Sequence, residues 1–459
     1  MPIISTHPNR VLIIGVVIRN FKTVNEKKIH LNNQQAVWHP CTQMKHHEAF
    51  PPVLITRGEG VWLYDAGGKR YLDSISSWWV NLFGHCNPRI NAAIVDQLGK
   101  LEHAMLAGLA HEPVIALSER LATITPGDLS HCFYASDGSS ANEIALKMSF
   151  HYWQQSGFPG KTRFLCLQNG YHGETLGALS VTDIPLFRQT YAPLLRPAHP
   201  MPTPDWRFAE AGVTPEAHAL KAAAELENYL AQHHASTAAL ILESLIQGAS
   251  GMGMYHPVYL RKAREICDRY QVHLITDEIA VGFGRTGTLF ACEQAGITPD
   301  FMSLAKGLSG GYLPLSVVIT HDNIYQAFYC NETSRAFLHS HSHSGNALAC
   351  RAALASLDII EQDNVIEVNR KKTDIFNQYL QPVREHSSVR NFRNCGMIWA
   401  FEVENPRPDF ARWFTQRGLE QQLLIRPLDN SVYIMPPYII NEEEMQWVAQ
   451  GVLHILDEM

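Results

Sequence analysis

Short apolar runs alternate with longer helical patterns from about Gly84 to His341, and this alternation constrains the fold more than any other feature of the sequence. Strands that are joined by helices pair in parallel, and a parallel sheet needs helices on both faces. The sequence therefore predicts an α/β fold with a mostly parallel sheet, in which residues 200–204 and 205–215 are loops. The expected strands are 131–135, 163–167, 238–243, 273–276, 301–304 and 315–320, and the expected helices include 114–123, 219–233 and 257–269.

A chain of 459 residues exceeds what one hydrophobic core usually holds, so two domains are expected. Residues 36–84 form the first part of a small domain, in which the turn Asp65–Gly68 closes a hairpin. Residues 85–345 form the large domain, and residues 346–459 return to the small one as an α+β segment. Its expected elements are helices 346–361, 365–380 and 442–456 and strands 397–401, 423–426 and 432–435.

Composition indicates a globular protein, because 46% of the residues are hydrophobic and 18% are charged. The net charge of −7 and the lack of a basic run argue against a nucleic-acid partner. The nine cysteines include no C-x-x-C pair, which argues against a disulfide framework or a zinc ribbon. Reduced thiols favour the cytoplasm.

Residues 1–35 are expected to be an extension outside both domains, with one apolar run, Val11–Ile18. Eight residues are too few to span a membrane, which takes about 20. A signal peptide is the alternative, but no small-x-small cleavage site precedes Arg19 and Lys22. We therefore expect no membrane partner.

An acid and an amine each stand where an apolar strand ends. Asp277 follows the run 272–276, and Lys306 follows the run 301–305. In α/β sheets, ligands bind outside the carboxyl ends of the strands. A lysine among Ala and Gly residues has a lowered pKa and can form a Schiff base with a carbonyl. An acid beside it suits the pyridinium nitrogen of pyridoxal phosphate, which is our hypothesis for the cofactor.

A glycine–serine turn between the strand that ends at Ala135 and a helical pattern is the candidate phosphate site. Gly138 and Ser139 lie in this turn, where free N–H groups and the helix dipole favour an anion. Ser140 and Glu143 have the spacing of a capping box. An ordinary helix cap without a ligand is the alternative.

Three aromatic residues and one arginine complete the candidate site. Tyr171 follows a strand and is flanked by glycines, so it could stack on a flat cofactor or be a simple turn tyrosine. Trp78 and Trp79 are adjacent and cannot share one face of a strand, so at least one should point away from a small core. They form either an aromatic wall for an aliphatic substrate or a core contact. Arg426 ends an apolar run and could bind a carboxylate or form a structural ion pair.

Residues Gly282–Gly287 match G-x-G-x-x-G, which suggests a dinucleotide site. That fingerprint needs glycine directly after the strand, where Asp277 and Glu278 stand here and would repel a pyrophosphate. No helix is expected to begin at Gly287. A nicotinamide oxidoreductase is therefore the weaker alternative.

Histidines alternate along residues 339–343, and alternate side chains of an extended segment point the same way. Their spacing provides no carboxylate or thiolate partner, so we expect no metal. Ser342, within this segment, could instead donate to a phosphate.

Residues 274–287, followed by 304–308, resemble the signature of the class III aminotransferases, a fold type I pyridoxal-phosphate family. The resemblance covers about residues 37–457. It implies a large domain with a seven-stranded sheet and a small domain from both chain ends. Further segments resemble the branch of this family that acts in biotin synthesis: 38–40, 76–79, 169–173, 425–427 and 433–438.

The resemblance assigns the cofactor residues. Lys306 would form the Schiff base and carry protons, and Asp277 would keep the pyridine nitrogen protonated. Gly138 and Ser139 would bind the phosphate together with Ser342 of the partner subunit, so a homodimer with a shared active site is implied. Tyr171 would stack on the cofactor ring and, as a third catalytic residue, line the substrate channel.

The resemblance also assigns the substrate residues. They are Trp78, Tyr171, Lys306, Gly311, Arg426 and Tyr433. Arg426 would bind the carboxylate of a long aliphatic keto acid. In the biotin branch the amino donor is S-adenosylmethionine and the acceptor is 8-amino-7-oxononanoate. Cys41 stands at a donor-site position where some relatives have an aromatic residue. The alternative function is that of another class III transaminase, acting on ω-amino acids or diamines.

Overall fold

The computed structural model describes residues 36–459, so the predicted extension 1–35 lies outside the described residues. The described chain divides into a small unit, residues 36–57 and 64–69, and a large unit, residues 58–63 and 70–459. This division does not test the predicted domain boundaries after residues 84 and 345, which stay predictions.

The small unit contains η1 (Met44–Glu48) and parts of two strands, β1 (Ile55–Glu59) and β2 (Trp62–Asp65). Within it, the Arg57 guanidinium lies over the Tyr64 ring, 3.7 Å from the ring centroid. The Lys69 backbone N–H donates to Asp65 Oδ1 at 2.8 Å. The predicted hairpin turn at Asp65–Gly68 is thereby closed by the side chain of its first residue.

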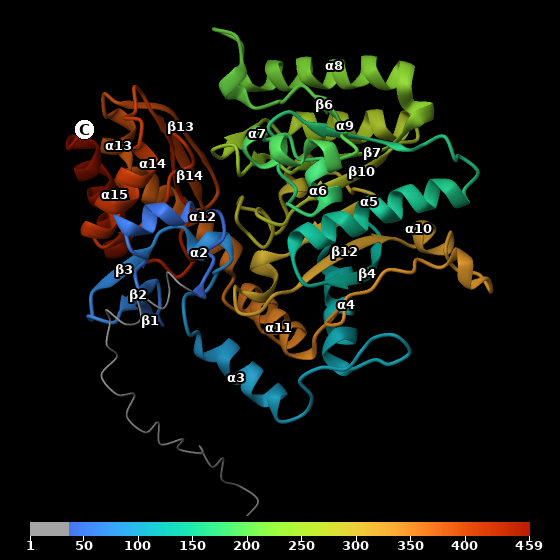
Figure 1. The fold of residues 1–459 in the computed structure, drawn as a ribbon, viewed down its shortest axis with the longest axis horizontal. Coiled ribbons are helices and arrows are strands. Elements are labelled where there is room, and N and C mark those ends of the chain that lie inside the picture. Colours follow the sequence, from blue (N-terminus) through green and yellow to red (C-terminus); the bar gives the residue numbers. More distant parts are fainter. Residues whose placement is uncertain (1–35) are drawn as a thin grey trace, which may run out of the picture. The chain divides into compact units, whose positions relative to one another are not determined.

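A seven-stranded sheet in the order β4-β12-β11-β10-β7-β5-β6 forms the centre of the large unit (Figure 1). β12 runs opposite to the other six strands, which are all parallel to one another, so the predicted mostly parallel sheet is confirmed. The strands are β4 (Leu129–Ala135), β5 (Arg163–Leu167), β6 (His199–Met201), β7 (Thr237–Glu243), β10 (His273–Asp277), β11 (Phe301–Leu304) and β12 (Ser316–His321).

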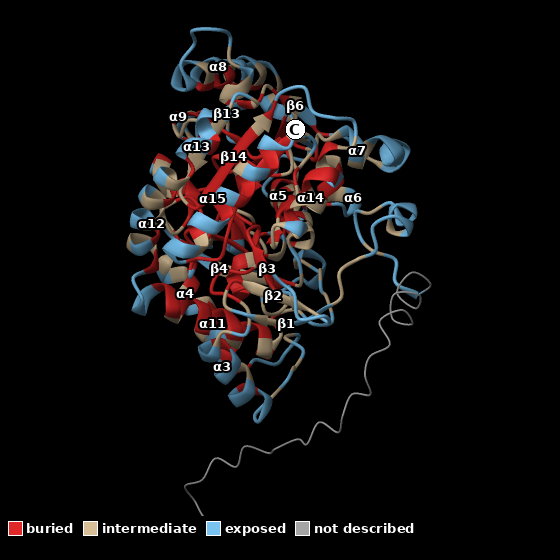
Figure 2. Ribbon diagram, turned by 90° about the vertical axis from the view of Figure 1, so that its left-hand side faces the viewer, coloured by how far each residue is buried: buried red, intermediate tan, exposed pale blue. Residues whose placement is uncertain are grey.

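Alternate residues of the central strands belong to two different cores. Ile241, Ile275 and Phe301 pack in one cluster with the apolar stripe of α5 (Gly138–Gln155). Leu240, Leu274 and Met302 belong to the other cluster, with residues of α8 (Pro215–His233) and α9 (Val258–Arg269). Helices on both faces explain why these strands are continuously apolar. Buried residues, red in Figure 2, accordingly gather on the strands and on the inner helix faces.

The remaining helices of the large unit are α2 (Ser76–Trp79), α3 (Pro88–Leu98), α4 (Glu112–Ile124), α6 (Leu176–Ser180), α7 (Pro185–Arg188), α10 (Asp322–Gln326), α11 (Ala347–Gln362), α12 (Val365–Tyr379), α13 (Gln381–Glu385), α14 (Phe410–Glu420) and α15 (Glu442–Asp457). Its 3-10 turns are η2 (Gln189–Leu194), η3 (Trp206–Phe208), η4 (His234–Ser236), η5 (Ala291–Ala295), η6 (Lys306–Ser309) and η7 (Thr333–Arg335). None of the helices within residues 36–459 has the length and hydropathy to cross a membrane.

The C-terminal part adds an antiparallel sheet, and it also pairs with an early strand. The sheet has the order β13-β14-β16, with β13 (Val389–Cys395), β14 (Ile398–Val403) and β16 (Ser431–Ile434). β15 (Leu423–Leu424) runs parallel to β3 (Arg70–Asp73), with Leu424 opposite Asp73. A short hairpin, β8 (Ile246–Gln247) with β9 (Gly253–Met254), lies after β7.

Two local expectations are wrong. Residues 200 and 201 belong to the edge strand β6 rather than to a loop, because an edge strand pairs on one side only and tolerates the missing N–H of Pro200. The capping box at Ser140 and Glu143 does not form: α5 is capped by Asp137, whose Oδ1 accepts the Ser140 N–H at 2.9 Å. Glu143 instead accepts the Ala178 N–H at 2.8 Å.

Four consecutive non-glycine residues, Ser76–Trp79, form a left-handed turn with φ between 46° and 75°. The turn is closed by the N–H of Val80, which donates to the carbonyl of Ser76 at 2.9 Å. The left-handed helical conformation costs about 1–2 kcal/mol of free energy for each L-residue. The two tryptophans separate as expected: Trp78 is 43% exposed and Trp79 only 5%.

Candidate active site

Acidic residues and the lysine gather at one edge of the central sheet. Glu243, Asp277 and Ser303 are register partners at the carboxyl ends of β7, β10 and β11, which are adjacent and parallel. The chain leaves β11 through Ala305 and places Lys306 first in η6, with a left-handed φ of 46°. Two carboxylates and one amine therefore share the edge where α/β proteins bind ligands.

Lys306 is held in an environment that favours its neutral form. Burial lowers its pKa to about 8, although the negative charges of Asp277 and Glu243 act in the opposite direction. Its Nζ lies 4.3 Å from the centroid of the Trp79 ring, a cation–π distance. An amine with this pKa is a competent nucleophile near neutral pH.

Asp277 is buried and fixed by three contacts. Its Oδ2 accepts a hydrogen bond from Asn142 Nδ2 at 2.7 Å and lies 2.9 Å from His172 Nδ1, while Oδ1 accepts the Ile279 N–H at 3.0 Å. A second Asn142 proton goes to the His172 carbonyl at 2.8 Å. A carboxylate held in this way is positioned to pair with a cationic ring nitrogen.

The N-terminus of α5 provides a place for an anion. Within residues 36–459, the N–H groups of Gly138 and Ser139 have no hydrogen-bond acceptor. The Ser139 hydroxyl accepts the N–H groups of Glu174 at 3.1 Å and Thr175 at 3.0 Å. Gly173 allows this contact, because a Cβ there would lie 2.3 Å from Ser139 Oγ. With Asn142 joining α5 to Asp277, the donor set fits pyridoxal phosphate.

Tyr171 and Glu243 lie beside this cradle. The Tyr171 N–H donates to Glu243 Oε2 at 2.9 Å, and the Tyr171 hydroxyl donates to Glu174 Oε1 at 3.0 Å. The tyrosine ring is half-buried, with the Phe187 ring 5.4 Å away. Burial, with a further contribution from Asp277, raises the pKa of Glu243 to about 7.

The predicted substrate residues other than Tyr171 lie in the left-handed turn or against it. The Arg426 guanidinium lies 4.8 Å from the centroid of the Trp78 ring. The Tyr433 ring contacts the Trp79 ring edge-on at 6.0 Å, and burial raises the tyrosine pKa to about 12. Gly311 packs on the end of the turn, where a Cβ would lie 2.9 Å from the Val80 backbone.

Ser342 is separate from this cluster. It is exposed in the loop between η7 and α11, and its carbonyl lies 2.8 Å from His103 Nε2. No hydrogen bond within the described part of the chain joins Ser342 to Lys306 or the α5 N-terminus. The structure also shows no cluster of His, Cys, Asp or Glu within residues 36–459 that could hold a metal.

The glycine-rich segment 282–287 forms turns, and no helix begins at Gly287. Glu278 holds the adjacent loop by accepting hydrogen bonds from the N–H groups of Ala291 and Cys292, each at 2.8 Å. Arg285 is buried and donates to the Asn81 carbonyl at 3.0 Å. These contacts give the segment a structural role.

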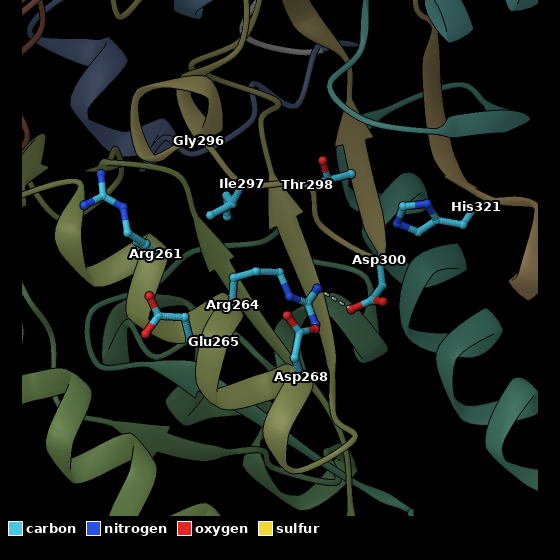
Figure 3. A pocket seen from close by; sticks show the side chains of 9 residues that line it. All are labelled: Arg261, Arg264, Glu265, Asp268, Gly296, Ile297, Thr298, Asp300 and His321. Carbon is cyan, nitrogen blue, oxygen red and sulfur yellow. Dashed lines mark hydrogen bonds and ion pairs between the residues drawn. The ribbon is translucent and has the colours of Figure 1, made fainter.

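A cavity of about 390 Å³ lies away from these residues, between α9 and the segment before β11 (Figure 3). Arg264 there pairs with Asp300 at 2.6 Å. Asp300 precedes β11 and Lys306 follows it, so the cavity lies at the amino ends of the strands and the catalytic candidates at the carboxyl ends.

Three contributors to the site were not predicted: Asn142, His172 and Glu243. Glu243 carries the same signal as Asp277, an acid at the end of an apolar strand. His172 lies within the glycine-flanked motif of Tyr171. Nothing in the sequence distinguishes Asn142 beyond its place near the N-terminus of α5.

The chain matches the family model described as aminotransferase class-III over residues 43–456. It belongs to the class III aminotransferases, pyridoxal-phosphate-dependent transaminases, and the predicted family and cofactor are thereby confirmed. An adenosylmethionine-8-amino-7-oxononanoate aminotransferase of Helicobacter pylori is 46% identical over 432 residues, 92% of this chain and 96% of the relative. The Geobacter sulfurreducens protein of the same name is 40% identical, over 92% of this chain and 95% of the relative.

Solved structures share the fold. The crystal structure of adenosylmethionine-8-amino-7-oxononanoate aminotransferase from Methanocaldococcus jannaschii has a TM-score of 0.88 and 34% identity, and the match covers 95% of this chain and 99% of that one. The ω-transaminase from Pseudomonas jessenii in complex with PMP has a TM-score of 0.89 and 30% identity, with coverages of 94% and 98%.

Proposed function

We propose that this aminotransferase moves an amino group from S-adenosylmethionine to 8-amino-7-oxononanoate and so forms 7,8-diaminononanoate in biotin synthesis. The names of its relatives support the substrates. One observation carries the proposal: Lys306 and Arg426 each stack on one of two adjacent tryptophans, Trp79 and Trp78. An amine and a carboxylate-binding group on one aromatic wall suit a long aliphatic keto acid.

Each residue has a proposed role. Pyridoxal phosphate, when bound, acts as the electron sink for both half-reactions. Lys306 Nζ binds the cofactor and then moves a proton to and from the reacting carbon. Asp277 holds the proton of the ring nitrogen, Gly138 and Ser139 bind the phosphate, and Tyr171 stacks on the ring.

We also propose a homodimer in the cytoplasm. Ser342 of the partner subunit would complete the phosphate site, since Ser342 is exposed and lies outside the cluster of its own chain. No disulfide bond joins cysteines within residues 36–459, which supports a reducing compartment.

Separate half-reaction spectra test the substrates. Purified enzyme loaded with pyridoxal phosphate is mixed with S-adenosylmethionine, lysine or a γ-amino acid, and the visible band of the Lys306-bound cofactor is followed. We expect S-adenosylmethionine to bleach the band and 8-amino-7-oxononanoate to restore it.

The second candidate is another class III transaminase for ω-amino acids or diamines, which the likeness to ω-transaminases favours. If only the γ-amino acid bleaches the band, this second function replaces the first. A protein that instead titrates with NADH would contradict both.

A further inference from the structure

The left-handed turn α2 has no glycine to make its backbone conformation easy. Ser77 and Trp78 have φ/ψ of 46°/55° and 70°/44°, which L-residues rarely adopt in succession. Such a conformation persists only where neighbouring groups hold it, and it is concentrated at functional sites. The group that holds this turn therefore controls the positions of the Trp78 and Trp79 side chains.

Asp73, at the end of β3, is that group. Its side chain is fully buried, and both of its oxygens bind Ser77: Oδ1 accepts the backbone N–H at 2.8 Å and Oδ2 accepts the hydroxyl proton at 2.6 Å. His85 Nε2 also lies 3.1 Å from Oδ2, and His85 Nδ1 lies 3.1 Å from Asn81 Nδ2. Asp73 thus holds Ser77, the second residue of the turn, and through His85 it also contacts the segment that follows the turn.

The turn sends its two tryptophans to the two ends of the candidate substrate site. The Trp79 ring lies under the Lys306 amine and against Gly248, where a Cβ would lie only 3.1 Å from the ring. The Trp78 ring lies under the Arg426 guanidinium. Both rings depend on the same backbone conformation, because they are adjacent residues within it.

We propose that Asp73 is a positioning residue. By holding Ser77 it fixes both tryptophans, and so it orients the Lys306 end and the Arg426 end of the substrate site at the same time. This inference rests on the proposed function for the role of Arg426. It adds a residue that touches neither substrate nor cofactor.

Asp73→Asn tests the proposal, because an amide can accept the Ser77 N–H but its NH2 group cannot accept the hydroxyl proton. We expect the second-order rate constants of both half-reactions to fall about 10- to 100-fold, as for a misplaced catalytic group. Cofactor-free enzyme gives a separate readout: nonanoate binding, followed by tryptophan fluorescence, should weaken about threefold or more as the Trp78–Arg426 stack loosens. Constants within about twofold of wild type would overturn the proposal.

A second substitution separates positioning from simple loss of stability. Glycine adopts the left-handed conformation without steric cost. Ser77→Gly added to Asp73→Asn should therefore recover about fivefold or more of the lost rate. If the double variant is no faster than Asp73→Asn alone, Asp73 does not act through the turn.

The matched control is Asp205→Asn, a fully buried aspartate that pairs with Arg207 outside the turn. It should lower the melting temperature and leave both half-reaction constants near wild type. Should Asp73→Asn not fold, Ser77→Ala removes only the hydroxyl contact and should still lower both constants about threefold or more. An unchanged Ser77→Ala enzyme would then count against the proposal.

A wild-type enzyme that rejects the proposed substrates would overturn the proposed function alone. The variants would then be compared on a donor that the wild-type enzyme accepts.

Discussion

The sheet edge that holds Asp277 and Lys306 and the turn that holds Trp78 and Trp79 reach the same site by opposite means. The sheet edge uses regular strands, whose register places Glu243 beside Asp277, and Lys306 follows the end of the next strand as the first residue of η6. The turn uses a disfavoured backbone that one buried carboxylate fastens. Side chains on regular strands are positioned by the strand pairing itself. The two tryptophan rings keep their positions only while Asp73 holds the turn.

The largest expected effect falls on the sheet edge. Lys306→Ala should lower transamination by about 10⁴-fold, the upper range for a proton-transfer group, and abolish the visible band of the Lys306-bound cofactor. Absorption spectra and steady-state rates measure both. A variant with the colour and turnover of wild type would remove this residue from the mechanism.

Asp277→Asn should have the next largest effect. Loss of one partner of a buried charge pair costs about 3–5 kcal/mol, which corresponds to about 10²- to 5 × 10³-fold in rate. The control is Glu278→Gln, whose carboxylate accepts two backbone N–H groups away from the sheet register. Equal losses of rate in the two variants would mean that any buried carboxylate in this region matters, and not the position of Asp277 in particular.

Arg426→Ala examines the turn region. A hydrogen bond to a charged group contributes about 1.5–3 kcal/mol, so the acceptor half-reaction should slow by about 10- to 100-fold. The donor half-reaction with S-adenosylmethionine should change less, and stopped-flow spectra with each substrate separate the two. A loss confined to the donor side would reverse the assigned role of Arg426.

The mildest test uses pH and links the two regions through Lys306. Because its pKa is lowered to about 8, the free amine is half of the total at pH 8 and levels off about one pH unit higher. Cofactor-free enzyme should therefore bind pyridoxal phosphate about tenfold faster at pH 7 than at pH 6, with a plateau above about pH 9. A rate that keeps rising to pH 10 would indicate an ordinary lysine.

Much of the sheet could be predicted because its signals are local. Apolar runs ended by Asp277 and Lys306 matched β10 and β11 to within a residue or two. The edge strand β6 was missed because Pro200 is typical of loops. The capping box was wrong because Asp137 caps α5 first, a competition that spacing cannot resolve.

By itself, the sequence determined the order of strands and helices, the acid and amine at the strand ends, and the class III signature. Only the tertiary structure decided that Glu243 and His172 flank Asp277, and that Ser76–Trp79 turns left-handed. The physical reason is that strand and helix preferences arise between residues close in sequence. The turn combines a sequence neighbour, Asp73, which is buried and bonds Ser77, with Lys306 and Arg426, which are distant in sequence and lie over its two tryptophan rings.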